Sequence, residues 1–291
     1  MCGVIDIGSN SVLLVVGEEN RILLDEDRVT RLGEGLNHSK RLKMEAMIRT
    51  SQVVCEFKNT ARKIGAQKVI AVGTMALRMA ENAPEFLELV KERCSLDVKI
   101  LSGEEEAILS FRGAYHSLNL KGRVAVADIG GRSTEVATGD GEKIEFIRSF
   151  NIGALTLLEH FLHTDTLEIM IDYSMKTFSS AEIRSDHLAG IGGTITNLAA
   201  IKLRMETYNP DRVHGLILTY GEIYEIASKL ASMTQLERKK VKGLQPRRVD
   251  TIVPGSAIVL GLMKALGFDR IVVSDRGLRH ALLKDCSSEH F

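Results

Sequence analysis

The sequence contains no tryptophan, only four prolines and few aromatic residues, 5% in all. It also has no net charge, because 38 Lys and Arg residues balance 38 Asp and Glu residues. A neutral chain exerts no long-range attraction on nucleic acid or on an anionic membrane, so we expect neither partner. A polyanion would have to be bound by local groups of charge.

Long hydrophobic runs are missing as well. The longest uncharged stretch that could enter a bilayer, residues 251–263, has 13 residues and is interrupted by Pro254. A membrane-spanning helix needs about 20 apolar residues. We expect no signal peptide, because residues 3–7 already have the pattern of a buried strand.

Cysteine is scarce, with four residues at Cys2, Cys55, Cys94 and Cys286. No two of them have the C-x-x-C spacing, so the pattern fits neither a zinc site nor a disulfide framework. We therefore expect four small buried side chains and a reducing cytoplasm as the compartment.

The sequence has instead a short polar turn between two apolar runs, and this unit occurs twice. Residues 4–16 read as strand, turn and strand, and residues 124–131 repeat the first strand and turn with Asp128 lying 122 residues after Asp6. A Gly-Thr pair also recurs, since Thr194 follows Thr74 by 120 residues. One echo alone could be a chance match, but two in the same order predict a duplicated α/β half.

The 291 residues are enough for two such halves. The polar stretch 116–123 is the expected boundary, with domains at residues 1–115 and 116–291. Between the repeated turns, the patterns predict a helix over 43–64 and strands over 68–72 and 98–101.

Both turns have the composition of a phosphate-binding loop. Glycine lets backbone N–H groups approach an anion closely, and the neighbouring hydroxyl and amide side chains add neutral donors. Each turn follows an acidic residue at a strand end, Asp6 or Asp128. A carboxylate beside a phosphate is favourable only if a hard divalent cation lies between them, so we expect such a cation.

Hydrolysis also requires a group that accepts a proton from water. Glu104, Glu105 and Glu106 open a predicted helix just before the second half, and a carboxylate there could act as the base. For Glu104 and Glu105 we favour simple helix capping. Arg78, after the first Gly-Thr pair, could contact a phosphate oxygen or form a surface ion pair.

Together these motifs resemble the exopolyphosphatase / guanosine pentaphosphate phosphohydrolase family over nearly the whole chain. The resemblance is carried by Asp6-Ile7-Gly8-Ser9-Asn10-Ser11, Gly73-Thr74-Met75-Ala76-Leu77-Arg78, Leu101-Ser102-Gly103-Glu104-Glu105-Glu106-Ala107, Asp128-Ile129-Gly130-Gly131-Arg132-Ser133-Thr134-Glu135, Val253-Pro254-Gly255-Ser256-Ala257-Ile258 and Ser274-Asp275-Arg276-Gly277-Leu278-Arg279.

The resemblance implies an α/β protein with the actin-like ATPase fold, in which two ribonuclease H-like domains surround a central cleft. It implies an Mg²⁺-dependent exopolyphosphatase that hydrolyses the terminal phosphoanhydride of inorganic polyphosphate. Glu106 matches the family's catalytic base and Arg78 its motif arginine, while Asp128 and Glu135, joined by Asp6, match the metal-associated acids. The implied phosphate-binding residues are Gly8, Ser9, Asn10, Ser11, Gly130, Gly131, Arg132, Ser133, Thr134, Gly192, Gly193 and Thr194.

The chain departs from the family pattern at two places. Arg132 stands where the second turn usually has a third glycine, so it either blocks the loop or directs its guanidinium at the phosphate. Only 12 residues follow Arg279, so the chain resembles the short form without the C-terminal helical domain.

Alternative functions stay open from the sequence. Guanosine pentaphosphate is a second candidate substrate. Two other classes of protein are rivals: a nucleotide-dependent phosphotransferase, and a non-catalytic sensor that binds polyphosphate or an alarmone. The basic stretch 237–242, with Arg247 and Arg248 beyond it, is either a solvated helix end or a track for a polyanion. A homodimer is the default expectation for the assembly.

Overall fold

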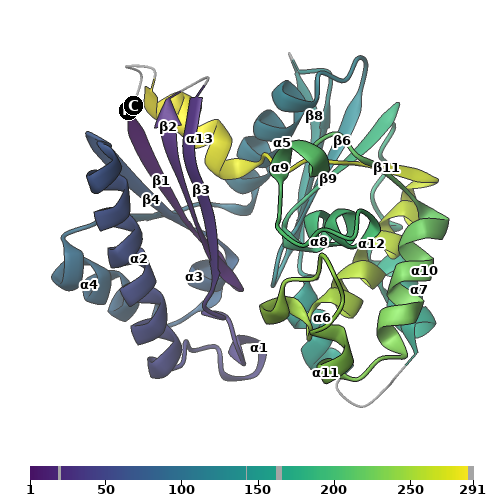
Figure 1. Ribbon diagram of the computed structural model, residues 1–291, viewed down its shortest axis with the longest axis horizontal. Coiled ribbons are helices and arrows are strands. Elements are labelled where there is room, and N and C mark those ends of the chain that lie inside the picture. Colours follow the sequence, from purple (N-terminus) through teal and green to yellow (C-terminus); the bar gives the residue numbers. More distant parts are fainter. Residues whose placement is uncertain (19–20, 142, 162–165, 288–291) are drawn as a thin grey trace. The chain divides into compact units, whose positions relative to one another are not determined.

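The computed structural model describes residues 1–18, 21–141, 143–161 and 166–287 (Figure 1). The chain divides into two compact units: unit 1 contains Met1–Leu109 and Leu278–Phe291, and unit 2 contains Ser110–Gly277. Within the described ranges, no helix is both long enough and apolar enough to cross a membrane.

Unit 1 is built on a five-stranded sheet in the order β3-β2-β1-β4-β5. Strand β1 lies in the centre, antiparallel to β2 and parallel to β4. Its side chains alternate between two apolar clusters, because Ile5 and Ile7 pack on one face of the sheet and Val4 on the other. The strands are β1 (Cys2–Ile7), β2 (Ser11–Glu18), β3 (Arg21–Val29), β4 (Lys68–Gly73) and β5 (Val98–Ile100).

Helices cover both faces of this sheet. Helix α2 buries Met47, Val54 and Phe57 in the same cluster as Ile5, and it ends at Gly65, which has a left-handed conformation. Helix α13 packs against β1 and β2 with Leu282 in the cluster of Val4. The helices of unit 1 are α1 (Leu36–Ser39), α2 (Met44–Ile64), α3 (Met75–Met79), α4 (Ala83–Cys94), α5 (Gly103–Leu118, whose last residues belong to unit 2) and α13 (Leu278–Ser287).

The position of α13 differs from the division that the sequence predicts, since residues 116–291 are expected to form one domain. A polar cluster adds to the apolar contacts that place α13 in unit 1. Asp25 on β3 accepts hydrogen bonds from Arg279 and His280 at 2.9 Å each. Burial raises the pKa of Asp25, but the charges and hydrogen bonds of Arg279 and His280 outweigh it and hold that pKa far below its ordinary value.

Unit 2 repeats the arrangement in a six-stranded sheet of order β10-β11-β9-β6-β7-β8. Strand β6 is antiparallel to β7 and parallel to β9, as β1 is to β2 and β4. Even an irregularity recurs, because the register shifts at Gly17 in unit 1 and at Gly139 in unit 2. The strands are β6 (Val124–Ile129), β7 (Thr134–Gly139), β8 (Ile144–Phe150), β9 (His187–Ile191), β10 (Ile217–Thr219) and β11 (Arg270–Val273).

The predicted duplication is therefore confirmed, and each unit has the ribonuclease H-like topology of the predicted α/β fold. The cleft between the units stays a prediction. Helices of unit 2 pack around α12, which is buried along most of its length. The helices of unit 2 are α6 (Ala154–His160), α7 (Leu167–Phe178), α8 (Gly193–Lys202), α9 (Pro210–Val213), α10 (Tyr220–Ala231), α11 (Gln235–Arg238) and α12 (Ile252–Leu266), with a 3₁₀ turn at Pro246–Arg248. Those that pack against α12 are α6, α7, α8 and α10.

The expectation of four unpaired cysteines is wrong. Cys2 at the start of β1 forms a disulfide with Cys286 on α13, and Cys55 on α2 forms one with Cys94 on α4. The partners are 284 and 39 residues apart in sequence, so only the packing of these elements brings them together. The prediction of a cytoplasmic location consequently loses its support from cysteine usage.

Candidate functional site

The first glycine-rich turn, between β1 and β2, is held from one side. The N–H of Gly8 donates to the carbonyl of Ser11 at 2.9 Å and closes the turn. The carbonyls of Ser9 and Asn10 accept hydrogen bonds of 2.9–3.0 Å from backbone N–H groups of residues 30–33. The N–H groups of Ser9 and Asn10 donate to no other residue in the described part of the chain.

The second turn, between β6 and β7, has the same construction with different supports. The N–H of Gly130 donates to the carbonyl of Ser133 at 3.0 Å. The first amides of α6 take the place of residues 30–33, because Ala154 donates to the carbonyl of Gly130 at 3.0 Å and Leu155 to that of Gly131 at 2.7 Å. Among the described residues, none accepts a hydrogen bond from the N–H of Gly131 or Ser133.

This pattern matters because a peptide unit carries its N–H and its C=O on opposite sides. The fixed carbonyls of Ser9 and Gly130 therefore direct the N–H groups of Asn10 and Gly131, which share their peptide units, to the other side, where they are suited to an anion. The geometry of the predicted turns, like their composition, is suited to an anion. One predicted donor differs, since the Thr134 hydroxyl donates to the carbonyl of Ile152 at 2.7 Å.

Arg132 does not direct its guanidinium at a bound phosphate in this arrangement. Its side chain is fully buried and forms a two-pronged ion pair with Glu159 on α6, at 2.8 and 2.5 Å. Arg132 has no positive φ angle, so the chain needs no glycine there. The arginine therefore anchors the second turn to α6. Whether it also blocks the turn is a prediction that turnover of Arg132→Gly tests.

Glu106 and Arg78 are brought together within unit 1. Arg78 Nη1 donates to Glu106 Oε2 at 2.7 Å and to the carbonyl of Leu101 at 2.8 Å. Both side chains are largely buried, with 10% of Glu106 and 18% of Arg78 exposed. Of the two roles considered for Arg78, the structure shows an ion pair, but a mostly buried one whose partner is the predicted base. Contact of Arg78 with a phosphate oxygen stays a prediction.

The neighbouring Glu105 has the capping role expected of it. Its carboxylate accepts the N–H of Ser102 at 2.8 Å, and the Ser102 hydroxyl accepts the N–H of Glu105 at 3.0 Å. The hydrogen bond from Ser102 and the ammonium of Lys99 lower the pKa of Glu105. Glu104 is exposed, so of the three acids only Glu106 is buried.

The acids of unit 2 are direct neighbours. Asp128 on β6 and Glu135 on β7 are opposite each other in the antiparallel register, which places their side chains on the same face of the sheet. Ser110 donates to Asp128 Oδ2 and Ser149 to Glu135 Oε1, each at 2.7 Å. In unit 1, Asp6 faces Leu13, so the first half has no second acid at this position.

Two adjacent carboxylates repel unless a cation or a proton lies between them. Their hard oxygen atoms suit Mg²⁺, which commonly binds through one or two carboxylates together with substrate phosphates and water. The described residues contain no cluster of three or more His, Cys, Asp or Glu side chains that could hold a metal ion on its own. A two-carboxylate site completed by phosphate is consistent with both observations.

The third predicted loop, Gly192 to Thr194, lies beside Asp128. Gly192 has φ of 97°, and a Cβ atom there would be 2.7 Å from the carbonyl oxygen of Ile129 and 3.3 Å from Asp128 Oδ1. Only glycine permits both this conformation and this approach. The sequence placed Arg248 only in a basic stretch, whereas the structure places its guanidinium against Gly193 at the start of α8. No short sequence pattern links the Gly192-Gly193 pair to an arginine so far along the chain, so the sequence could not predict this contact.

Several known proteins are similar to this chain over nearly its whole length. Exopolyphosphatase 2 of Mycobacterium tuberculosis is 28% identical to this chain over 94% of both proteins. A guanosine-5'-triphosphate,3'-diphosphate pyrophosphatase of Vibrio parahaemolyticus is 29% identical over 98% of this chain and 59% of its own length. The chain spans only about half the length of some of its curated relatives.

A solved structure of the Ppx/GppA family member of Aquifex aeolicus is 34% identical and has a TM-score of 0.81. The match covers 97% of this chain and 95% of the other. Residues 4–290 also match the Ppx/GppA phosphatase family as a whole. The predicted resemblance is confirmed, and the chain belongs to the Ppx/GppA phosphatase family.

Proposed function

We propose that this protein is an Mg²⁺-dependent exopolyphosphatase that releases orthophosphate from the end of inorganic polyphosphate. The observation that carries the proposal is the pair of matching turns whose carbonyls are fixed and whose N–H groups remain available for an anion. Family membership supports a phosphatase. A relative of similar length is named an exopolyphosphatase, which supports this substrate over others.

The reaction is attack of water on the terminal phosphorus atom. A new P–O bond forms to the water oxygen, the bond to the bridging oxygen breaks, and the shortened polyphosphate leaves with the bonding electron pair. Glu106 accepts the proton of the attacking water, and Arg78 at 2.7 Å fixes the orientation of its carboxylate.

The backbone N–H groups of each turn are suited to phosphoryl oxygens, where negative charge is concentrated during transfer. Asp128 and Glu135, with Asp6 as a further candidate, would hold Mg²⁺. When bound, the ion neutralises charge on the phosphate oxygens. Arg248, against Gly193, adds a fixed cation beside the third loop.

Guanosine pentaphosphate is the second candidate substrate, because a relative covering 98% of this chain is named for cleaving it. The non-catalytic sensor is less favoured. That alternative depends on Arg132 having spoiled the second turn, whereas Arg132 is buried against Glu159 and the turn keeps its geometry. A cytoplasmic location and a homodimer stay predictions.

The deciding experiment measures orthophosphate release from short polyphosphate, long polyphosphate, ATP and guanosine pentaphosphate, with Mg²⁺ and with EDTA. We expect polyphosphate to be cleaved fastest and only with Mg²⁺. Glu106→Gln should keep substrate affinity and lose about 10²–10⁴-fold in turnover, the range typical of a general base. Glu104→Gln, on the same turn of α5 but exposed, is the matched control and should keep its activity.

Two results would contradict the proposal. Full activity of Glu106→Gln would show that another group accepts the proton. Preference for guanosine pentaphosphate over every polyphosphate length would assign the second candidate function instead.

A further inference from the structure

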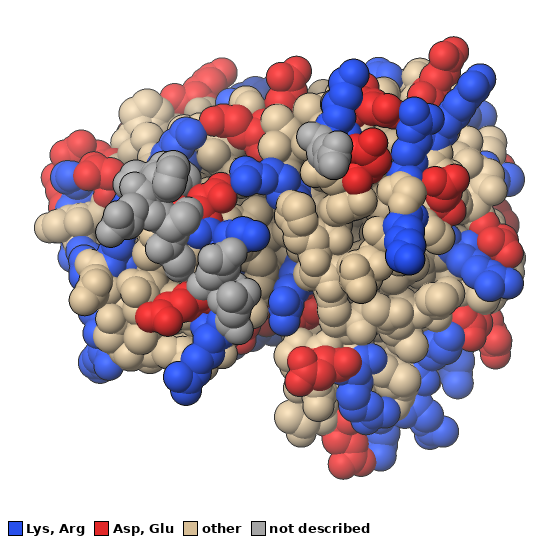
Figure 2. Space-filling model, turned by 90° about the horizontal axis from the view of Figure 1, so that it is seen from above, with Lys and Arg blue, Asp and Glu red and all other residues tan. Residues whose placement is uncertain are grey.

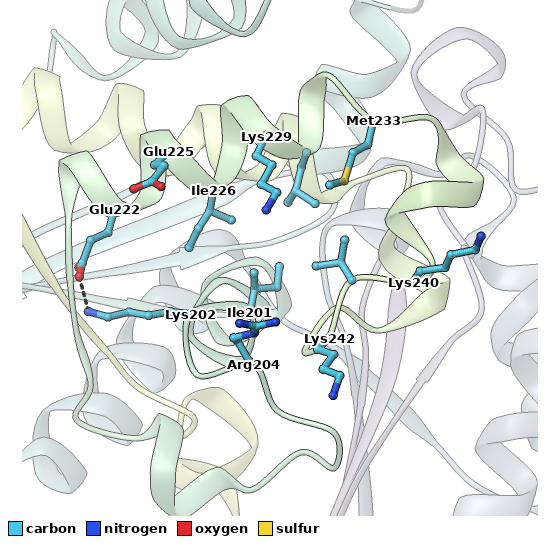
Figure 3. A pocket seen from close by; sticks show the side chains of 12 residues that line it. Ile201, Lys202, Arg204, Glu222, Glu225, Ile226, Lys229, Met233, Lys240 and Lys242 are labelled. Atoms are coloured by element: carbon cyan, nitrogen blue, oxygen red, sulfur yellow. Dashed lines mark ion pairs between the residues drawn. The ribbon is translucent and has the colours of Figure 1, made fainter.

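Unit 2 contains a pocket that the proposed reaction does not use. It lies between the C-terminal end of α8, the helix α10 and the segment 240–242, and its volume is about 640 Å³ (Figure 3). The phosphate-binding loop Gly192 to Thr194 is at the opposite end of α8. A volume of this size is in the range of sites for small organic ligands.

The pocket has an excess of positive charge, although the protein as a whole has no net charge. Figure 2 shows basic and acidic side chains interspersed over the face that it displays. The pocket instead has two acids, Glu222 and Glu225, against five cationic side chains, and one of those acids pairs with a pocket lysine at 2.7 Å. The cationic side chains are Lys202, Arg204, Lys229, Lys240 and Lys242.

Three of these cations form no ion pair with the described residues, and one of the three, Lys240, is near enough to Glu237 to lower the pKa of that carboxyl. Lys202 pairs with Glu222, and Lys242 pairs with Glu206 at 2.6 Å. Arg204 and Lys229 form no ion pair with any residue that the structure describes. These two side chains are therefore available to an anionic ligand.

Arg204 also occupies an unfavourable backbone conformation. Its φ angle of 49° is in the left-handed region that follows the end of α8. Glycine or asparagine usually takes this position, and another residue there costs roughly 1 kcal/mol. An arginine at this point destabilises the fold slightly, while its side chain gives the pocket a charge.

The wall of the pocket is apolar. Figure 3 shows Ile226 and Met233 extending toward the pocket from the side of α10, opposite Ile201. Leu230 and Val241 complete this surface. An inorganic anion would leave the apolar wall without a partner, and a neutral apolar molecule would leave the cations without one.

We propose that this pocket binds a nucleoside polyphosphate, with the base on the apolar wall and the phosphates on Arg204 and Lys229. Aromatic bases provide a flat apolar surface, and phosphate oxygens form the charge-assisted hydrogen bonds that arginine and lysine favour. The dimensions, the charge and the apolar wall together fit this class of ligand.

Helix α8 joins the pocket to the loop Gly192 to Thr194. Helix α8 has 10 residues, so its ends are about 15 Å apart. Gly243, with φ of 90°, packs directly on the Ala200 carbonyl of α8, and the N–H of Gln245 donates to Asn197 Oδ1 at 2.8 Å. A ligand held between α10 and segment 240–242 would therefore contact the elements that position Gly193, and it should change the rate of phosphate release. This expected change in turnover rests on the proposed function, whereas binding of the ligand does not.

Isothermal titration of the full chain with the β,γ-imido analogue of ATP, in EDTA, tests the binding site. We expect inorganic tripolyphosphate to bind at least tenfold more weakly than the analogue, and adenosine to show no binding at millimolar concentration. Arg204→Gly and Lys229→Ala should each weaken the analogue about tenfold. Arg204→Gly removes the left-handed arginine, so its melting temperature should not fall.

Two controls complete the test. Lys239→Ala changes an exposed lysine that does not line the pocket and should leave binding unchanged. Asp128→Asn alters the proposed reaction site and should also leave affinity for the analogue unchanged. The proposal is overturned if tripolyphosphate binds as tightly as the analogue, if Arg204→Gly binds normally, or if Asp128→Asn abolishes binding. Phosphate release from polyphosphate is measured separately, so failure of the proposed reaction would be seen independently of this site.

Discussion

The buried pair between Arg132 and Glu159 provides the sharpest test of how the second turn is held. Arg132→Gly restores the residue that the family pattern favours at this point. If arginine blocked the turn, the change would increase turnover. Because the guanidinium is buried against α6, we expect the opposite: lower stability and no gain in turnover.

The size of the effect follows from the exposure of the two partners. Removing Arg132 leaves Glu159, which is 16% exposed and can be partly hydrated. The lost pair should cost about 2–3 kcal/mol, and the greater backbone freedom of glycine adds about 0.5–1 kcal/mol. Removing Glu159 instead leaves a guanidinium with no exposed surface, so Glu159→Ala should cost more, about 3–5 kcal/mol.

The assay is thermal unfolding of the three variants Arg132→Gly, Glu159→Ala and the double change, with orthophosphate release measured in parallel. At roughly 2–4 °C per kcal/mol for a unit of this size, Arg132→Gly should lower the melting temperature by about 5–15 °C. The double variant should be more stable than Glu159→Ala, because it leaves no buried charge. A large gain in turnover for Arg132→Gly, or equal stability of the two single variants, would refute this reasoning.

Three further predictions follow from the structure. Glu135→Gln removes one of the two acids beside each other and should raise the Mg²⁺ concentration needed for half-maximal phosphate release about tenfold, whereas an unchanged requirement would place the ion elsewhere. Asp25→Asn should destabilise unit 1 by about 2–3 kcal/mol at pH 7. Since the native pKa of Asp25 is lowered, its contribution is present above the unfolded value of about 4 and declines as the pH falls below it, so the wild-type and variant stabilities measured by urea unfolding should converge in acid. Reduction should lower stability by about 2–4 kcal/mol through the 39-residue loop that Cys55 and Cys94 close, and finding four reactive thiols in the unreduced, unfolded protein would contradict the pairing.

The local elements were predictable because their signals lie within a few residues. Apolar runs beside a turn of Gly, Ser and Asn predict the two hairpins, and α2 (Met44–Ile64) follows from its helical spacing. Strand β3 escaped prediction, since its sequence from Arg21 to Val29 contains five charged residues. An edge strand tolerates such charges because one of its edges is not paired.

The candidate site also has some residues that the sequence could predict and others that it could not. Asp6, Asp128 and Glu106 are recognisable because each lies within a short motif, and the family pattern assigns them together. The contact of Arg248 with Gly193 depends on packing between segments 55 residues apart, which no local pattern records. The same holds for the pocket beside α8, whose cations come from three separate segments.

By itself, the sequence determined the duplication, the two glycine-rich turns and the family, because these depend on backbone geometry over a few residues and on their repetition. The tertiary structure decided how those turns are held: by residues 30–33 in unit 1, and by the first turn of α6 and the Arg132–Glu159 pair in unit 2. It also decided that α13 completes unit 1 and that the cysteines pair. Such contacts join residues distant in the chain, and only the close packing of the folded interior selects which of them meet.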